Sequence, residues 1–198
     1  MRETPACGGG KDSRDAGCRI SGKNAKRRKR NDMKKCVFAG TFDPPTIGHK
    51  EVAERALEVF DEVIIAIMVN PDKTPLFSAE ERERFWRLAT NTDRVKIIVS
   101  DKTAAEVMET TGADCYLRGV RNGADFDYET ANYYVSEKLS GRFLTFYVPC
   151  PQELLHVSSS AVRALLKFSQ PIDGYVAAEA KDAILESYRL KLAERNGK

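Results

Sequence analysis

Several signals that place a sequence in a familiar class of protein are missing here. No apolar run approaches the roughly 20 residues that cross a bilayer, so no membrane-spanning helix is expected. The first residues lack the apolar middle part of a secretory signal. The five cysteines are scattered without a CxxC pair, which indicates neither a zinc site nor a disulfide framework. We therefore expect a cytoplasmic protein with free thiols and no metal-ligating residues.

The most common nucleotide-binding motifs are also absent. The sequence has no GxxxxGK[ST] phosphate loop and no GxGxxG, so neither a P-loop NTPase nor a nicotinamide-dependent dehydrogenase is indicated. No Ser/His/Asp set for nucleophilic catalysis is evident, and the chain has only two histidines, His49 and His156. Any phosphate chemistry must therefore depend on other loops.

The net charge of +3 is unevenly distributed along the chain. Residues 1–32 contain ten Lys or Arg and four Asp or Glu, whereas residues 33–198 carry a net charge of −3. The first segment has almost no large aliphatic residues and cannot bury enough apolar surface to offset the entropy of folding. We expect a disordered basic leader over 1–32, or an extension before a working start at Met33, followed by one domain over 33–198. The basic run Lys26–Arg30 is a candidate for a weak nucleic-acid contact.

From residue 33 onwards, strand-like runs alternate with helix-like patterns. The run Val63–Val69 is apolar throughout, as a strand buried on both faces should be. The alternation predicts an α/β fold, a five-stranded parallel sheet with helices on both faces. The expected strands are Lys35–Ala39, Val63–Val69, Val95–Val99, Cys115–Leu117 and Leu144–Val148, and the expected helices are about 47–60, 78–91, 103–111, 125–139, 159–167 and 175–193. Ligands of such sheets bind at the carboxyl ends of the strands.

The loop after the first expected strand, Gly40–His49, reads GTFDPPTIGH. Gly40 permits close backbone approach, and Thr41 offers a hydroxyl and an N–H group. His49 lies at the start of the next helix, where free N–H groups and partial positive charge favour phosphate. The alternative interpretation is a proline-stiffened turn with a histidine as helix cap.

Three further strand exits carry side chains suited to an anion. Lys73 follows the second strand, between two prolines. Arg118 and Arg121 follow the fourth and form a natural clamp for phosphate, and Glu129 can pair with one of them or accept from a ribose or base. Ser158–Ser160 follow the fifth and supply a helix cap with hydroxyl and N–H donors. Each alone has an ordinary explanation, such as a solvated lysine or a surface ion pair, but together they predict one phosphate-binding pocket.

Four stretches in this order, GTFDPPTIGH, NPDKTPLFSAEER, LRGVRNGADFDYE and VSSSAVR, resemble the nucleotidyltransferase superfamily. Its marks are a TxGH-type signature, here Thr46–His49, and an ISSSxVR-type signature, here Val157–Arg163. Within it, the stretch from Met33 to the C-terminus is most similar to the bacterial phosphopantetheine adenylyltransferases. The resemblance implies a Rossmann-like nucleotidyltransferase fold, a homohexamer, and Mg²⁺-dependent transfer of the adenylyl group of ATP to 4′-phosphopantetheine. The products would be dephospho-coenzyme A and pyrophosphate, in the penultimate step of coenzyme A biosynthesis.

The resemblance also implies a role for each matching residue. His49 would bind ATP and stabilise the transition state, and Thr41 would contact both substrates. The other residues implied to bind phosphopantetheine are Lys73, Ala104 and Arg118. The other residues implied to bind ATP are Phe42, Gly119, Val120, Arg121, Glu129, Leu154, Leu155, His156, Val157, Ser158, Ser159 and Ser160. Thr103 and Ala104 depart from the family, which usually has a bulky Leu or Met beside the pantetheine arm, so a wider or more polar pocket is expected there.

The chemistry is consistent with these roles. The attacking phosphate is already an anion and needs no base, so the reaction requires in-line placement and positive charge. Three alternatives remain: a nicotinate-mononucleotide adenylyltransferase, a nucleic-acid-binding protein that uses Lys26–Arg30, and a non-catalytic ligand sensor. The second and third stretches favour the pantetheine branch, and the presence of His49, Lys73, Arg118 and Arg121 argues against the loss of catalysis.

Overall fold

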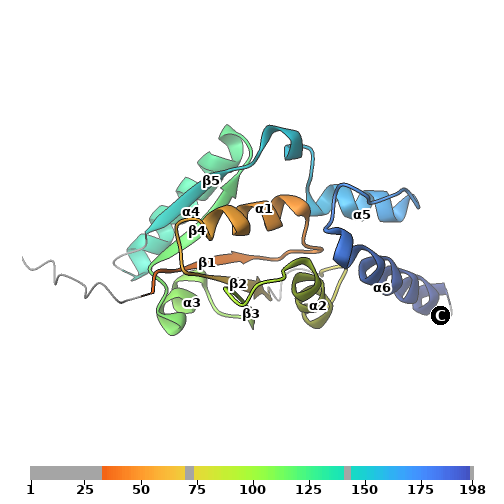
Figure 1. The fold of residues 1–198 in the computed structure, drawn as a ribbon, viewed down its shortest axis with the longest axis horizontal. Coiled ribbons are helices and arrows are strands. Elements are labelled where there is room, and N and C mark those ends of the chain that lie inside the picture. The colour runs from red at the N-terminus through yellow and green to blue at the C-terminus, as the bar shows by residue number, and fades with distance from the viewer. Residues whose placement is uncertain (1–32, 70–73, 141–143, 197–198) are drawn as a thin grey trace, which may run out of the picture. The chain divides into compact units, whose positions relative to one another are not determined.

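The central feature is a parallel sheet with the strand order β3-β2-β1-β4-β5, shown in Figure 1. The computed structural model describes residues 33–69, 74–140 and 144–196. All four strand pairs are parallel, which confirms the predicted fold class. The strands are β1 Lys35–Gly40, β2 Glu62–Met68, β3 Val95–Ser100, β4 Cys115–Val120 and β5 Thr145–Pro149. The order reverses between β1 and β4, and the crevice at their carboxyl ends is where ligands bind in such sheets.

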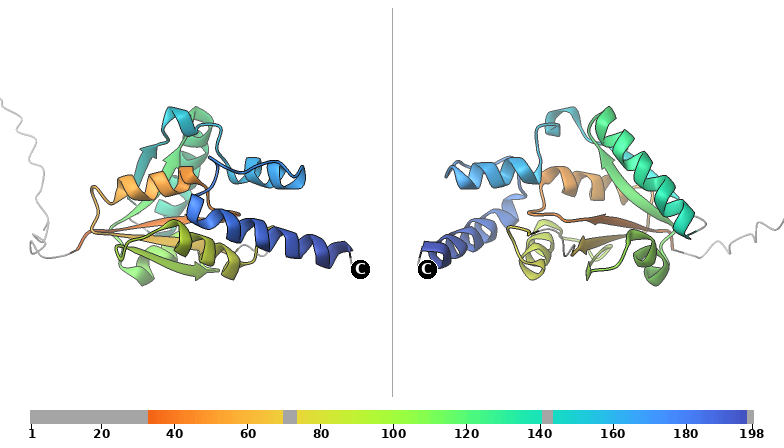
Figure 2. Two further views of the ribbon diagram at one scale, coloured as in Figure 1. Left: turned by 45° about the vertical axis from the view of Figure 1, so that its right-hand side comes forward. Right: turned by 180° about the vertical axis from the view of Figure 1, so that it is seen from behind.

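Helices cover both faces of the sheet (Figures 1 and 2). They are α1 Ile47–Ala56, α2 Ala79–Ala89, α3 Ala104–Thr111, α4 Gly123–Ser140, α5 Ser159–Lys167 and α6 Ala178–Asn196, with a short 3₁₀ helix, η1, over Gln152–Leu154. In both figures α5 and α6 lie beyond the carboxyl end of β1. None of the helices in the described ranges is long and apolar enough to span a membrane.

The period-two pattern of β1 and β2 divides the core into two layers. One face of these strands, including Phe38 and Ile65, packs against α1 and against Trp86 of α2. The other face, including Val37 and Ile64, packs against α3. A third cluster joins α2 to α5 and α6 through Phe85, Val162, Leu166, Ile172 and Ile184. This last cluster holds the two C-terminal helices at the ligand-binding edge of the sheet.

Two predicted boundaries are wrong for physical reasons. The first helix ends at Ala56 rather than at residue 60, and Val59 is exposed instead of buried. The guanidinium group of Arg94 accounts for the early end, because it donates to the carbonyls of Leu57 and Phe60 as the chain turns away. Strand β4 continues past Leu117 to Val120, because Arg118, Gly119 and Val120 still pair with β5. The leader over 1–32 lies outside the described residues, so its disorder and the domain boundary stay predictions.

Candidate active site

A cavity of about 310 Å³ opens at the carboxyl ends of β1 and β4. It brings together the first loop, the start of α1, the end of β4, α4 and the start of α5. The predicted site residues that line it are Thr41, Phe42, His49, Arg118, Gly119, Arg121, Glu129, Val157, Ser158, Ser159 and Ser160. Three of the four predicted motif loops, those after β1, β4 and β5, therefore converge on one cavity, whereas the described residues of the loop after β2 do not line it.

The first loop carries an unusual backbone conformation at Phe42. Its φ is +49°, in the left-handed region that non-glycine residues rarely adopt. Such a conformation costs roughly 1–3 kcal/mol and persists only when the surroundings hold it. The Phe42 ring is held by edge-on contacts with the rings of His49, Trp86 and Phe38, with centroid distances of 5.0, 5.1 and 5.2 Å. Gly40 is needed beneath this ring, because a Cβ there would lie 2.9 Å from it.

His49 is both a helix cap and a cavity residue, so the two interpretations of this histidine hold together. The backbone N–H of Thr46 donates to Nδ1 of His49 at 3.0 Å, and the Thr46 side chain caps the helix in return. Because Nδ1 accepts this bond, the proton of the neutral ring is on Nε2. Burial, followed by the charges of Arg121 and Arg118, lowers the pKa of His49 to about 4. At neutral pH the residue is therefore an uncharged N–H donor.

Arg118 and Glu129 form a bidentate ion pair across the cavity wall. Nε of Arg118 donates to Oε2 of Glu129 at 2.5 Å, and the second nitrogen donates to Oε1. The remaining nitrogen donates to the carbonyl of Ala39 at the end of β1, at 2.9 Å. Both side chains are largely buried, so the interpretation as a weak surface pair is wrong. The pair fixes the guanidinium plane where β1 and β4 separate.

Arg121 is held in a second, more exposed pair. Its Nε donates to Oδ2 of Asp125 at 2.9 Å, and this hydrogen bond lowers the pKa of Asp125. The strand before it approaches α1 closely at Gly119, where a Cβ would lie 2.8 Å from a methyl group of Val52. The glycine allows α1, and with it His49, to lie directly over the end of β4.

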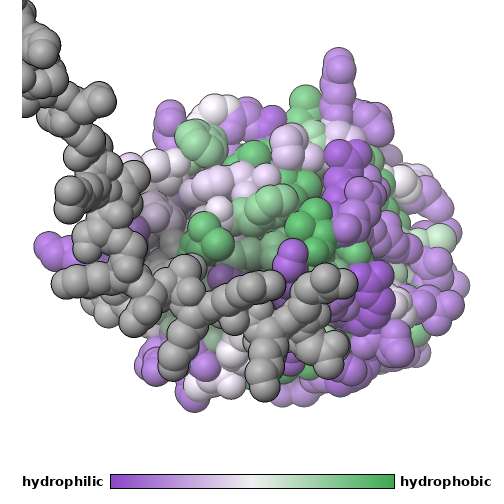
Figure 3. All heavy atoms as spheres, turned by 60° about the vertical axis from the view of Figure 1, so that its left-hand side comes forward, coloured by the Kyte–Doolittle hydropathy of each residue, from purple (hydrophilic) through white to green (hydrophobic). Residues whose placement is uncertain are grey.

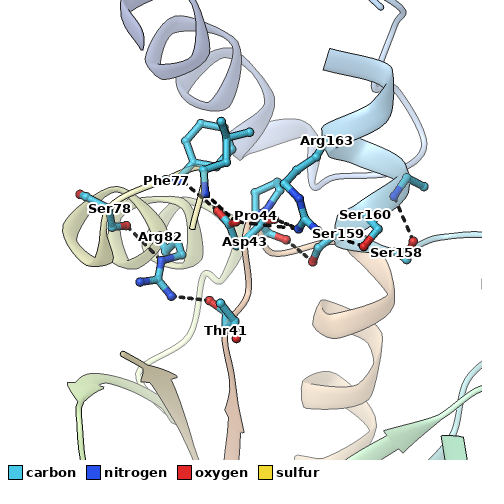
Figure 4. Close-up of polar contacts among 12 residues, drawn as sticks. Thr41, Asp43, Pro44, Phe77, Ser78, Arg82, Ser158, Ser159, Ser160 and Arg163 are labelled. Atoms are coloured by element: carbon cyan, nitrogen blue, oxygen red, sulfur yellow. Dashed lines mark hydrogen bonds and ion pairs between the residues drawn. The ribbon is translucent and has the colours of Figure 1, made fainter. Parts of the chain in front are cut away.

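The serine turn at the start of α5 is bonded to the first loop (Figure 4). Ser158 is the N-cap and accepts from the N–H of Ala161 at 3.1 Å. Ser159 Oγ donates to the carbonyl of Pro44 at 2.8 Å. Arg163 donates to the carbonyl of Asp43 at 2.6 Å and to Oγ of Ser160 at 3.0 Å. These bonds hold the hydroxyl groups beside Thr41 and His49.

Some predicted site residues lie outside this cavity. Lys73 is outside the described residues, and Val120, Leu154, Leu155 and His156 do not line the cavity. Ala104 lines a neighbouring hollow of about 230 Å³, and Arg118 and Glu129 line both spaces. The Thr103 hydroxyl donates to Glu106 at 2.7 Å in the capping box of α3. The polar group of Thr103 therefore stabilises the start of this helix. A larger cavity of about 830 Å³ borders Thr41 and Ser159 and continues along α6.

Sequence reasoning missed several residues that support the site. Asp43 is buried and accepts from the N–H groups of Leu76 and Phe77 at 2.8 and 2.9 Å. Arg82 is buried and bonds to the first loop (Figure 4). The available signal for Asp43 was its place between Phe42 and Pro44 in the first motif. No signal pointed to Arg82, because its neighbours in the sequence are also charged.

The fold and this cavity define a nucleotidyltransferase. Residues 37–165 match the family model described as cytidylyltransferase-like. The chain belongs to the phosphopantetheine adenylyltransferase family. It is 39% identical over 155 residues to the phosphopantetheine adenylyltransferase of Streptococcus pneumoniae (strain 70585), and the aligned residues cover 77% of this chain and 93% of that protein. It is 38% identical over 145 residues to the phosphopantetheine adenylyltransferase of Symbiobacterium thermophilum, and the aligned residues cover 73% of this chain and 90% of that protein.

Solved structures with lower identity share the fold. A putative nicotinate-nucleotide adenylyltransferase from Vibrio parahaemolyticus is 21% identical with a TM-score of 0.60, over 80% of this chain and 96% of that one. A bifunctional NMN adenylyltransferase/ADP ribose pyrophosphatase from Francisella tularensis is 18% identical with a TM-score of 0.57, over 83% of this chain and 53% of that one. At these identities the likeness concerns the fold alone.

Proposed function

We propose that the protein transfers the adenylyl group of ATP to the phosphate of 4′-phosphopantetheine, which yields dephospho-coenzyme A and pyrophosphate. The observation that carries the proposal is the convergence of His49, Arg118, Arg121 and the serine turn on one cavity. Neutral and cationic donors line the space, together with Asp125 and Glu129, whose carboxylates are engaged by arginines. The arrangement suits a direct displacement between two phosphates.

In this reaction a phosphate oxygen of phosphopantetheine attacks the α-phosphorus of ATP. A new P–O–P linkage forms as the bond from the α-phosphorus to the bridging oxygen breaks, and that oxygen leaves with pyrophosphate. Nε2–H of His49 donates to an oxygen of the α-phosphate as its charge grows. The cations of Arg118 and Arg121 stabilise the same charge, and the N–H groups at the start of α5 favour the leaving phosphates.

Magnesium enters this proposal with the nucleotide. In the described ranges no group of three or more His, Cys, Asp or Glu side chains could hold a metal ion. The carboxylates nearest the cavity, Asp125 and Glu129, are engaged by arginines. Mg²⁺ is commonly bound through substrate phosphates with few protein ligands. We therefore treat Mg-ATP as the substrate, with its ion held by phosphate oxygens.

The second substrate is assigned to the hollow beside the nucleotide cavity. Arg118 lines both spaces, so a phosphate bound to it can meet ATP on one side while the pantetheine arm extends along the other. Ala104 and Tyr133 line that hollow and offer apolar contacts, and Asn132 offers an amide. Lys73 is proposed as a further phosphate ligand on the strength of the sequence resemblance.

We also propose that the protein is a homohexamer in the cytoplasm. Several large apolar side chains are exposed, as expected of surfaces that subunits cover. On α4 and β5 they are Phe126, Tyr128, Tyr134, Val135 and Phe146. Figure 3 shows hydrophobic residues, in green, exposed among hydrophilic ones on one face. Native mass spectrometry measures the subunit number.

The proposed compartment rests on the cysteines. Cys36 of β1 and Cys115 of β4 are partners on neighbouring strands, and both are free thiols, as expected in a reducing compartment.

The function is tested by incubating the protein with Mg-ATP and phosphopantetheine and measuring pyrophosphate. Nicotinate mononucleotide is offered in a parallel reaction, because the same fold occurs in enzymes named for that substrate. Pyrophosphate release from Mg-ATP with phosphopantetheine but not with nicotinate mononucleotide supports the proposal. Pyrophosphate release with nicotinate mononucleotide but not with phosphopantetheine contradicts it. For the leader, nucleic-acid binding at two salt concentrations with and without residues 1–32 separates a phosphate contact from a solvated tail.

A further inference from the structure

Arg82 is a buried cation that forms no direct ion pair with any carboxylate of the described residues, although the charges of Asp43 and Glu80 act on it. It lies on α2 and is 2% exposed. None of the ion pairs formed within the described ranges includes it. Removing a guanidinium group from water is costly unless its donors are satisfied. The contacts that satisfy Arg82 therefore indicate what this position does.

Three backbone carbonyls accept hydrogen bonds from Arg82. Its Nε donates to the carbonyl of Ser78 at 3.1 Å, within the first turn of α2. One terminal nitrogen donates to the carbonyl of Thr41 at 2.6 Å and to that of Met68 at 3.3 Å. Figure 4 shows the bonds to Ser78 and Thr41. Thr41 follows β1 and Met68 ends β2, so one side chain ties α2 to the ends of two neighbouring strands.

The bond to Thr41 acts on the strained part of the first loop. The carbonyl of Thr41 belongs to the peptide unit that precedes Phe42, the residue with φ of +49°. Trp86 lies one helical turn after Arg82 and contacts the Phe42 ring at 5.1 Å between centroids. The same face of α2 thus holds both the backbone before Phe42 and its side chain.

The other side of the loop is held independently. Asp43 accepts two backbone N–H groups from residues 76 and 77, and Arg163 donates to its carbonyl. Arg82 itself does not line the nucleotide cavity, whereas Thr41 does. Of the three residues whose carbonyls Arg82 bonds, Thr41 is the one that lines this cavity, so the bond to Thr41 is the direct link from Arg82 to the site.

We propose that Arg82 is a positioning residue, which sets the backbone of Thr41 and Phe42 so that both substrates meet in the correct geometry. The inference rests on the proposed function, in which Thr41 contacts ATP and phosphopantetheine. Loss of the bond to Thr41 lets Phe42 relax towards an unstrained backbone. Both substrates then lose alignment at once, although no group that touches them has been removed.

The chain supplies a matched control in Arg94. This arginine also donates to three backbone carbonyls, those of Leu57, Phe60 and Asp61, at 2.7, 2.6 and 3.1 Å. It lies near the amino end of β2, opposite the site. Arg82→Lys and Arg94→Lys each keep the charge and remove the forked donor, and they differ in which backbone they release and in burial, because Arg94 is exposed.

The test compares the full-length protein with Arg82→Lys, Arg82→Gln and Arg94→Lys. We expect both Arg82 variants to fold and to lose about 10–100-fold in kcat/KM for both substrates, since small misplacements far from the chemistry reach 10²-fold. Hydrogen exchange over residues 40–46 should be faster in these variants, measured without substrates. Arg94→Lys should change Tm while leaving kcat/KM and that exchange as in the wild type.

Three results would overturn the inference. They are unchanged kinetics in the folded Arg82 variants, an equal kinetic loss in Arg94→Lys, and the failure of both Arg82 variants to fold, which would make the arginine a requirement of the fold. A wild-type protein without activity on phosphopantetheine rejects the proposed function instead. The exchange comparison then still decides whether Arg82 holds the loop.

Discussion

The backbone N–H of Thr46 donates to Nδ1 of His49 at 3.0 Å, and this bond leaves Nε2 as the protonated nitrogen of the ring. The residue that caps α1 therefore also fixes the tautomer of the proposed catalytic side chain. Burial disfavours a cation at this position, and repulsion by Arg121 and Arg118 adds to it, so the pKa of His49 is lowered.

Replacing His49 by Ala should lower kcat by about 10²–10³-fold, the usual cost of one donor to a developing anion. The variant also loses one half of the α1 capping box, so its stability falls as well. Glu106→Ala is the control, because Glu106 occupies the same position in the capping box of α3 and lines neither cavity. A loss of turnover in the control equal to that in His49→Ala would contradict the assigned role.

The pKa of His49 makes stability depend on pH. The folded protein protonates this ring near pH 4, whereas the unfolded chain does so near 6.5, so between these values the unfolded state binds more protons. The contribution is complete above about pH 6.5 and is lost as the pH falls towards 4, by about 1–2 kcal/mol between pH 7 and pH 5. Urea unfolding at the two pH values measures it. His49→Gln keeps a residue suited to the capping box and should lose less stability over this range, and an equal loss would exclude His49 as the source.

Arg118→Lys should raise KM for phosphopantetheine by about 10–100-fold, as expected for the loss of a charged hydrogen bond of about 1.5–3 kcal/mol. A lysine has three N–H donors, too few for both oxygens of Glu129, the carbonyl of Ala39 and a phosphate. Arg87→Lys removes a comparable arginine–glutamate pair, with Glu83, on the exposed face of α2, and should leave KM unchanged. Steady-state kinetics with each substrate varied in turn provides the comparison.

Gly119→Ala should destabilise the fold by about 1–3 kcal/mol, because the new methyl group overpacks the contact with Val52. Val52→Ala provides the missing space, so the double variant should be more stable than the sum of the single losses predicts. Urea denaturation of the four proteins gives the coupling energy. Strict additivity would mean that β4 and α1 do not meet as closely as the structure indicates.

The sequence predicted the sheet because apolar runs of the right length alternate with amphipathic stretches. It placed the loops after β1, β4 and β5 correctly because parallel strands bring their carboxyl ends to one edge. The end of β4 was missed because Arg118 interrupts the apolar run, although its side chain bonds back to Ala39 and Glu129. Arg82 was missed because it stands in the charged run Glu80–Arg84, which is typical of an exposed face. Its burial depends on carbonyls 41 and 14 positions away, which no local pattern reveals.

Arg118 and Glu129, which line both the nucleotide cavity and the neighbouring hollow, have a consequence for inhibitor design. A compound that joins an adenine nucleotide to a pantetheine-like chain would pass across Arg118 and Glu129 and occupy both spaces. Its chain would meet the small side chain of Ala104, where the resemblance leads one to expect a bulkier residue in related enzymes. A bulky substituent at that point would distinguish this protein from its relatives.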